Sequence, residues 1–372
     1  MNTDNCIDID QNIANKLFEV GAFLIIAGVP VGTEFGVDLC SYTIGENFRG
    51  IKLIPPGPHY VWCSSQGQFG DAAPRVGFIH YFKSKEILVR EWNRQEEELQ
   101  ERQIEDPNTE KAHIRENIKS LDRFLAPYDY RFLNKWKSLT NLVNEGTLSR
   151  CTPASGIIRT NVSLSSCPDA ERPRGPIKSI KMLNVKTILN ENDLLPNLKP
   201  LSGTMPIFIH LPNRVPQNAT PEEVTRHSID CIAAIDDLFN SISSFHILLE
   251  EIQLCFVFYL IGHSIESLDH WRRVIHLFSY SETATTKYKL FYKQYSELLA
   301  LEIPYLPEEL MEPTNRNTIY KDIRVLLKHL HSANLSLSAE HLSTKLYKEL
   351  KWDFRDLLID DPEDLPVVVE LD

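Results

Sequence analysis

Two histidines in strand-like segments are the side chains of this sequence most suited to metal chemistry. His59 and His80 each lie in a short run rich in β-branched and aromatic residues, and Tyr60 follows the first of them. Imidazole is a common metal ligand, so two histidines on neighbouring strands could meet in a metal site. No carboxylate or third histidine stands at a matching spacing. Ordinary core or surface histidines are therefore the simpler interpretation.

The glycine-rich segment Gly28-Val-Pro-Val-Gly-Thr-Glu-Phe-Gly36 has a composition that could suit a phosphate-binding loop. A P-loop ends in Gly-Lys-Ser/Thr, which is missing here, and Pro30 removes one of the backbone amides that would hold a phosphate. We therefore interpret the segment as a tight turn between two strands.

The seven cysteines are odd in number, scattered, and never arranged as C-x-x-C. A disulfide framework and a zinc site of the usual spacing are therefore not expected. The sequence also lacks the G-x-S-x-G, H-E-x-x-H and catalytic Cys–His signatures. We predict no enzyme activity, no catalytic residues, no cofactor and no metal.

The chain has 372 residues and a formal net charge of -12. The length suggests two or three domains, and an acidic surface disfavours direct binding of nucleic acid. The richest apolar run, Ile252 to Gly262, is too short to cross a membrane and is typical of a core helix. Residues 1–10 carry no secretory signal. We expect a cytoplasmic protein, with the nucleus as a second location.

Residues 1–150 are predicted to form a β-sandwich with attached helices. Short strand-like runs at 23–27, 51–54, 60–63, 76–82 and 87–92 are separated by Gly, Pro, Asn and Ser clusters, which favours an antiparallel sandwich or barrel. Amphipathic helices are expected over residues 11–20, 111–125 and 131–143, where apolar residues recur at helical spacing, whereas 94–105 is expected to be a charged loop or helix face.

Residues 151–215 are rich in Pro, Ser and Asn, and are predicted to be a linker with a possible strand at Ile207–Leu211 that returns to the first sheet. Residues 216–355 are predicted to be an all-α domain. Thr220-Pro-Glu-Glu223 is a helix start of the capping-box type, and several amphipathic helices joined by short loops follow it. The predicted class is therefore α+β with several domains.

Residues 356–372 form an acidic tail that ends in the strand-prone sequence Pro366-Val-Val-Val-Glu-Leu371. An exposed apolar strand favours aggregation unless something covers it. Two interpretations are open: the tail pairs with a sheet edge of its own chain, or it adds a strand to a partner protein.

Four segments together resemble the A1-cistron splicing-factor family, the AAR-two proteins. They are the Gly28–Gly36 segment, Gly50-Ile-Lys-Leu-Ile-Pro-Pro-Gly57, Trp136-Lys-Ser-Leu-Thr-Asn141 and the tail residues 366–371. Ala219-Thr-Pro-Glu-Glu223 and His270-Trp-Arg-Arg273 add support. The resemblance runs almost end to end in the same order and is weakest over 145–200.

The resemblance implies a helical domain similar to VHS domains and a role as an assembly chaperone of the U5 snRNP in pre-mRNA splicing. Family members bind the largest U5 scaffold protein, the Prp-eight protein, through its RNase H-like and Jab/MPN-like domains. They keep the Brr-two helicase, and RNA, off that scaffold until the particle matures. Their C-terminal tail acts as an added strand. That role maps here onto Pro366, Val367, Val368, Val369, Glu370 and Leu371.

Two other classes of function stay open. A small-ligand binder or enzyme could use the sandwich interior, with His59, His80 and Tyr60 near a pocket lined by convergent polar groups. An interior filled with Phe, Ile and Val would remove that alternative. An RNA-binding protein would need exposed aromatic residues in a basic groove, which the charge balance disfavours.

Overall fold

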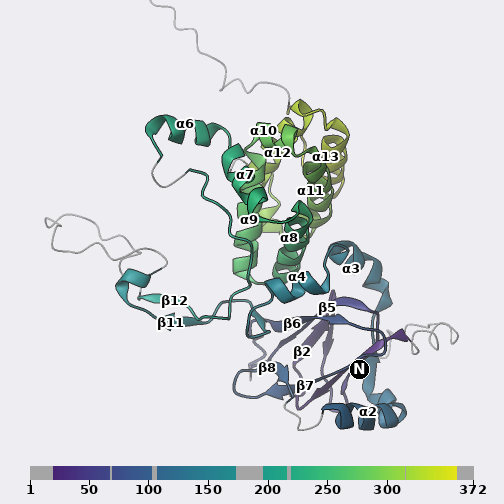
Figure 1. The fold of residues 1–372 in the computed structure, drawn as a ribbon. Helices are drawn as coiled ribbons and strands as arrows, with labels where there is room; N and C mark the ends of the chain where they lie inside the picture. The colour runs from purple at the N-terminus through teal and green to yellow at the C-terminus, as the bar shows by residue number, and fades with distance from the viewer. Residues whose placement is uncertain are drawn as a thin grey trace, which may run out of the picture. The chain divides into compact units, whose positions relative to one another are not determined.

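The computed structural model describes residues 20–67, 69–102, 107–172, 196–215, 219–314 and 316–357. The tail residues 366–371 and, apart from Val20, the helix expected over 11–20 lie outside these ranges. The chain folds into two compact units (Figure 1). The described part of the first falls within 20–128, 149–207 and 262–266, and that of the second within 129–148, 208–261 and 267–357.

The first unit contains two five-stranded sheets. In the first sheet the order is β8 (Glu98–Glu101), β7 (Ile87–Asn93), β1 (Ala22–Ala27), β4 (Gly50–Ile54) and β9 (Leu125–Pro127). In the second it is β10 (Ile158–Arg159), β6 (Val76–Phe82), β5 (Gly57–Ser64), β2 (Glu34–Val37) and β3 (Cys40–Thr43). The strands predicted from the alternating and β-branched runs are all present.

Strand direction differs from the antiparallel arrangement expected from the sequence. The second sheet is antiparallel, but in the first sheet β1 runs parallel to β7 and β4 runs parallel to β9. Parallel neighbours need a long connection, and here the hairpins of the second sheet and the helix before β9 provide it. In the sequence, a pattern of short strands and nearby turns does not reveal which strands are joined by such long connections.

A helix covers one face of the first sheet. Phe23, Ile87 and Val89 point to that face and pack with Leu125 against the apolar stripe of α2 (Pro107–Leu121), which includes Ile118. Their apolar strand neighbours Ala22, Leu24 and Leu88 are also buried, so the other face of this sheet is covered as well. This arrangement matches the predicted sandwich with an attached helix.

The segment after residue 150 is not structureless. Its strand β10 pairs with β6 at the edge of the second sheet, and β11 (Leu164–Ser166) pairs with β12 (Leu198–Pro200) in a small sheet of their own. The strand that returns to the first unit is therefore β10. Residues 207–211, where the sequence suggested a returning strand, form none.

Helices form most of the rest of the described chain, as the apolar spacing in the sequence predicted. They are α3 (Leu133–Thr140), α4 (Glu145–Cys151), α6 (Pro221–Ile229), α7 (Ile232–Ser241), α8 (Phe245–Leu260), α9 (Ile265–Ser279), α10 (Glu282–Lys287), α11 (Lys289–Glu302), α12 (Thr318–Ser332) and α13 (Ser336–Leu350). Short 3₁₀ turns lie at Asp122–Phe124, Tyr130–Phe132, Asp169–Glu171, Ile303–Tyr305 and Glu308–Leu310.

Helix α8 lies at the centre of the helical unit. Its residues from Glu251 to Phe258 are all buried, so it is covered on every side, as expected for a core helix. An aromatic cluster extends this core through α9 and α11. The ring of Phe291 lies 4.7 Å from that of Phe278 and 5.4 Å from that of Tyr295, between ring centres.

Candidate functional site

The Gly28–Gly36 segment is the turn between β1 and β2, as the sequence predicted, and then enters β2. Its last glycine faces Trp62 across the β2–β5 pair. A Cβ added at Gly36 would lie 2.1 Å from the indole ring, so no other residue fits without moving the tryptophan. The guanidinium of Arg75 lies 3.7 Å from the centre of the same ring. This segment therefore serves to hold the second sheet together.

Gly50 has an equally strict requirement. It begins β4 with φ of 139°, and an added Cβ would lie 1.9 Å from the carbonyl oxygen of Leu24 on β1. The close approach lets β4 pair with β1, where Gly50 lies opposite Ile25. The Gly50–Gly57 segment is thus explained by backbone packing rather than by a ligand.

The Trp136–Asn141 segment attaches α3 to the core of the helical unit. Trp136 is buried, and Gln253 of α8 bonds to the end of α3. The Gln253 amide nitrogen donates to the Ser138 carbonyl (3.2 Å) and to Asn141 Oδ1 (2.8 Å), and its oxygen accepts from the Leu142 amide (2.8 Å). One buried glutamine therefore satisfies backbone groups that the helix end leaves open.

The His270–Arg273 segment lies on α9 and makes internal contacts. Trp271 Nε1 donates to Glu302 Oε2 of α11 over 2.7 Å. His270 Nε2 lies 3.4 Å from Glu251 Oε1 of α8. Arg272 donates to the hydroxyl of Thr318 at the start of α12 over 2.9 Å. The segment joins three other helices, which is a structural task.

The predicted capping box at Thr220 is present. The Thr220 hydroxyl accepts from the Glu223 amide, and the Glu223 carboxylate accepts from the Thr220 amide over 2.8 Å. The amide and the hydroxyl of Thr220 both donate to the Glu223 carboxylate, and these two bonds lower the pKa of Glu223. The described side chains of the helix that begins there, α6, are exposed except for His227, which is half-buried.

The two candidate histidines lie opposite each other across the β5–β6 pair, but their ring nitrogens contact different protein groups. His59 is buried, with Nδ1 2.6 Å from Asp38 Oδ2 and Nε2 2.9 Å from the Pro55 carbonyl oxygen. His80 Nε2 lies 2.8 Å from Glu86 Oε1. Within the described ranges, no three His, Cys, Asp or Glu side chains gather as metal ligands would.

The sandwich interior is filled rather than hollow. Phe35, Val61, Phe78 and Phe82 are all buried in it, and Tyr60 is fully enclosed. An interior filled with such side chains argues against a small-ligand binder or enzyme that would use the space between the sheets.

A cleft of the first unit lies at the end of β1 and has a volume of about 820 Å³. Its lining includes Trp92, Arg49, Arg94, Glu46 and Glu97. Arg49 donates to the backbone carbonyls at 46 and 48, so part of its hydrogen-bonding capacity is used locally. The charges of the two positive and two negative side chains balance, so the cleft has no electrostatic preference for a phosphate backbone.

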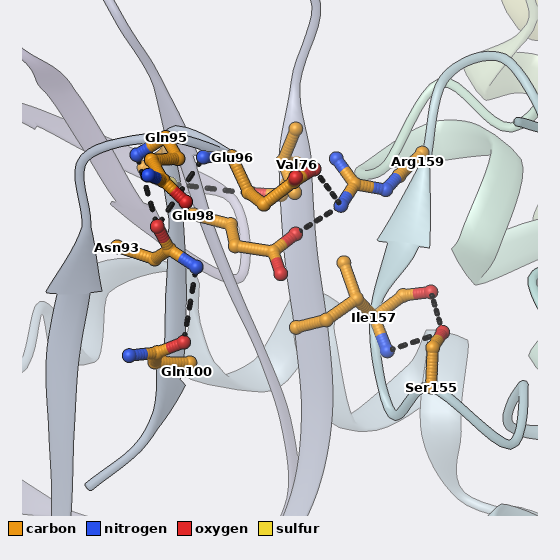
Figure 2. A network of polar contacts seen from close by, with 10 residues as sticks. Val76, Asn93, Gln95, Glu96, Glu98, Gln100, Ser155, Ile157 and Arg159 are labelled. Atoms are coloured by element: carbon orange, nitrogen blue, oxygen red, sulfur yellow. Dashed lines mark hydrogen bonds and ion pairs between the residues drawn. The ribbon is translucent and has the colours of Figure 1, made fainter.

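A polar network ties β10 to the β7–β8 hairpin (Figure 2). Arg159 forms an ion pair with Glu98 and lies 3.7 Å from Glu96. Desolvation raises the pKa of Glu98, and the arginine opposes that rise. Asn93 closes the hairpin by accepting from the amides at 95 and 96. The network connects the edge of one sheet to the edge of the other.

The base of the tail is firmly attached. After α13, Trp352 and Phe354 pack on Tyr320 of α12, with ring centres 5.2 and 5.4 Å away. Arg324 holds Asp356 through two hydrogen bonds of 2.9 Å. The partner-binding residues proposed from the resemblance, 366–371, lie outside the described residues. Their geometry therefore adds nothing to their assignment.

Among the described residues, no single helix combines the length and apolar character needed to span a membrane. The pair α7 and α8 reaches both together, but it is bent by 98° at the break between them.

The two compact units define the chain as an α+β protein. The residues of the segments described above stabilise its fold. Residues 20–153 match the model of the AAR2 N-terminal domain, and residues 208–355 match the AAR2 C-terminal repeat region. The chain belongs to the AAR2 family.

Relatives cover the chain almost completely. It is 32% identical to the protein AAR2 homolog of Mus musculus over 380 residues and to that of Homo sapiens over 383 residues. Each alignment covers 98% of this chain and 97% of the relative. The protein AAR2 homolog of Caenorhabditis elegans is 28% identical over 363 residues, covering 93% of this chain and 98% of the relative.

Proposed function

We propose that this chain is a non-enzymatic assembly chaperone of the U5 snRNP in pre-mRNA splicing. It binds the largest U5 scaffold protein, the Prp-eight protein, through the RNase H-like and Jab/MPN-like domains of that partner. It holds off the Brr-two helicase and RNA until the particle matures. The observation that carries the proposal is the family match, which spans both units and nearly the full length. Its place of action is the cytoplasm, with the nucleus as a second location.

Charge supports this role. The net charge of -12 suits a protein that competes with RNA for a basic scaffold surface. Binding of this kind weakens as salt increases, because screening shortens the range of the attraction. An affinity for the scaffold that does not change with salt would contradict the electrostatic part of the proposal.

The tail is proposed to bind the partner by strand addition through Pro366, Val367, Val368, Val369, Glu370 and Leu371. Its attached base supports this assignment, because Leu357 is buried and the segment before it is fixed to α12. Eight residues, 358–365, separate that base from Pro366 and can span at most about 28 Å. The added strand can therefore reach an edge well away from the helical unit.

Binding of recombinant scaffold protein to the full chain and to a version that ends at Leu365 tests both statements. We expect truncation to abolish or strongly weaken binding. A second version with Val368→Pro keeps the tail length and removes one strand hydrogen bond, so it should also weaken binding. Full binding by the truncated chain would move the interface to the folded units. Absence of binding by every version would overturn the proposed function.

A further inference from the structure

Helix α12 carries a row of basic side chains along one side. Lys321, Arg324 and Lys328 are spaced three and four residues apart, so they lie one above another on the same side of the helix. The two lysines are exposed and the arginine is half-buried. The only carboxylate of this helix, Asp322, is buried beside His276 of α9 and does not lie in the row. We call the three cationic residues the basic row.

The charges of the basic row are only partly compensated. Like charges at these spacings repel each other and destabilise a helix. The two terminal nitrogens of Arg324 each lie 2.9 Å from one oxygen of Asp356, and this contact lowers the pKa of the aspartate. Lys321 and Lys328 form no ion pair within the part of the chain that the structure describes. Two cations of the row therefore need a counter-charge from elsewhere.

The chain that follows α13 runs along α12 to this row. The Asp353 carbonyl accepts from the Tyr320 hydroxyl over 3.4 Å. Asp356 then contacts Arg324, which lies one turn further along the helix. The side chain of Leu357, where the described residues end, is buried. The chain beyond Leu357 therefore starts beside the basic row.

The sequence that follows is acidic. Residues 360–364 read Asp-Asp-Pro-Glu-Asp, and residues 358–372 contain no lysine or arginine. A row of cations and a run of carboxylates attract each other, and several charges that act together contribute more than an isolated exposed pair. The charge of this acidic run is therefore complementary to that of the basic row.

The acidic run is close enough to the row to bind it. Asp360 is four residues beyond Asp356, and a chain of this length spans at most about 14 Å. Lys328 lies about 6 Å beyond Arg324 along the helix axis, and Lys321 lies about 4.5 Å away in the other direction. Tethering gives the run a local concentration on the order of millimolar, so it competes well with a separate acidic partner.

We propose that the acidic run 360–364 binds the basic row of α12 in the free chain, and so extends the contact that Asp356 makes with Arg324. The strand-prone residues 366–371 begin two residues after this run, so the contact fixes the point at which they leave the helical unit. The proposal concerns the free chain and does not rest on the proposed function.

Zero-length cross-linking of the full chain tests the contact. A carbodiimide joins a carboxylate to a lysine amine with loss of water, and mass spectrometry then identifies the linked peptides. We expect links from the acidic run to Lys321 or Lys328 to be at least about fivefold more abundant than links to Lys348. Lys348 is exposed on α13 and nearer in sequence, so it measures chance encounters. Equal yields at the three lysines would overturn the proposal.

A matched pair of neutral variants provides a readout that does not depend on cross-linking. A protease that cuts after glutamate should cleave the full chain at Glu363 only while the acidic run is released from the row. Lys328→Gln should raise this cleavage rate by about threefold, whereas Lys348→Gln should leave it within about 1.5-fold of the wild type. Equal changes in both variants, or no change in either, would contradict the proposal.

Salt and RNA identify a different occupant or a different kind of contact. The Debye length falls from about 10 Å in 0.1 M salt to about 3 Å in 1 M salt, so the cross-links should decline by at least about threefold. Cross-links that persist in 1 M salt would show that apolar residues hold the tail, which would overturn the proposal. So would a fluorescent single-stranded RNA that binds the full chain but not Lys328→Gln, in a chain without tail cross-links, because a separate polyanion would then occupy the row.

Discussion

Trp271 and Glu302 form a hydrogen-bonded pair in the core of the helical unit, with Nε1 2.7 Å from Oε2 and neither side chain exposed. Burial raises the pKa of Glu302 well above its ordinary value of 4.5, and the bond from the indole opposes that rise only in part. The other oxygen, Oε1, has no hydrogen-bond partner among the described residues. The folded unit therefore favours the neutral form of this carboxyl group more strongly than the unfolded chain does.

This pair predicts a pH dependence of stability. A raised pKa in the folded state means that the contribution of Glu302 is fully present below pH 4.5 and is lost as the pH rises through the folded value. Glu302→Gln keeps an acceptor for the indole and cannot ionise. We expect this variant to be more stable than the wild type at pH 7, by about 1.4 kcal/mol for each unit by which the folded pKa exceeds 4.5, counted only up to pH 7.

Urea unfolding of both proteins from pH 4 to pH 8 measures the difference. Below pH 4.5 the unfolding free energies of the wild type and Glu302→Gln should approach each other. The difference between them should increase as the pH rises above 4.5. Glu302→Ala is the control, because it leaves the indole N–H unpaired and should destabilise at every pH. Curves for wild type and Glu302→Gln that run parallel across the range would refute a neutral carboxyl.

Gln253 is predicted to be the main polar tie between α3 and α8. Replacing it with alanine leaves the Leu142 amide and the Ser138 carbonyl without their partner, and should cost about 2–3 kcal/mol of unfolding free energy. Gln294→Ala on α11 is the matched control, because this side chain forms no hydrogen bond with any described residue, and it should change stability by less than about 0.5 kcal/mol. Similar losses in both variants would mean that the bonds to α3 contribute little.

Helices with a strong apolar period could be predicted closely from the sequence. In α12 the apolar positions Ile319, Ile323, Leu326 and Leu330 are all buried, because a repeat of three and four residues places them on one face. The period gives the type of element and its inner face. It cannot give the partner, which is why the attachment of α3 to α8 through Gln253, more than a hundred residues away, was not foreseen.

Strand β8 shows the opposite case. Its sequence Glu-Leu-Gln-Glu contains one apolar residue, Leu99, in a charged stretch that the sequence analysis interpreted as a loop or helix face. The strand forms because the turn after β7 brings it alongside, and it lies at a sheet edge, where polar residues are tolerated. The composition of such a segment does not predict a strand that forms because a neighbouring strand pairs with it.

The segments that carry the family resemblance could be located from the sequence, but their tasks could not. Gly36 is required by the ring of Trp62, and Gly50 by the backbone of β1. Both are contacts between strands, which a single sequence does not contain. The residues proposed to bind the partner, 366–371, lie outside the described residues and rest on the resemblance.

Gly36→Ala is predicted to destabilise the first unit by about 2–3 kcal/mol, because the added methyl group would overlap the Trp62 ring and force a repacking. Gly45→Ala is the matched control, since among the described residues no atom beyond its chain neighbours lies within 4 Å of a Cβ at that position. Thermal unfolding followed by tryptophan fluorescence compares the two. If both variants melt with the wild type, the ring moves aside without cost and the packing argument fails.

Asp38 and His59 are predicted to be energetically coupled. The Asp38 carboxylate accepts from the Tyr60 amide (2.9 Å), the Tyr128 hydroxyl (2.8 Å) and His59 Nδ1 (2.6 Å), and Asp38 and His59 are both 2–3% exposed. Removing one member of a buried hydrogen-bonded pair leaves the other without its partner, so Asp38→Asn and His59→Gln should each cost about 1–3 kcal/mol.

A double-mutant cycle then isolates the pair. Either single substitution already removes the contact between Asp38 and His59, so the second one cannot remove it again. The double variant should therefore lose about 1–3 kcal/mol less unfolding free energy than the sum of the two single losses. Tyr128→Phe provides the reference for losing one neutral hydrogen bond, about 1 kcal/mol. Additive losses would show that the two side chains stabilise the unit independently, in spite of the 2.6 Å contact.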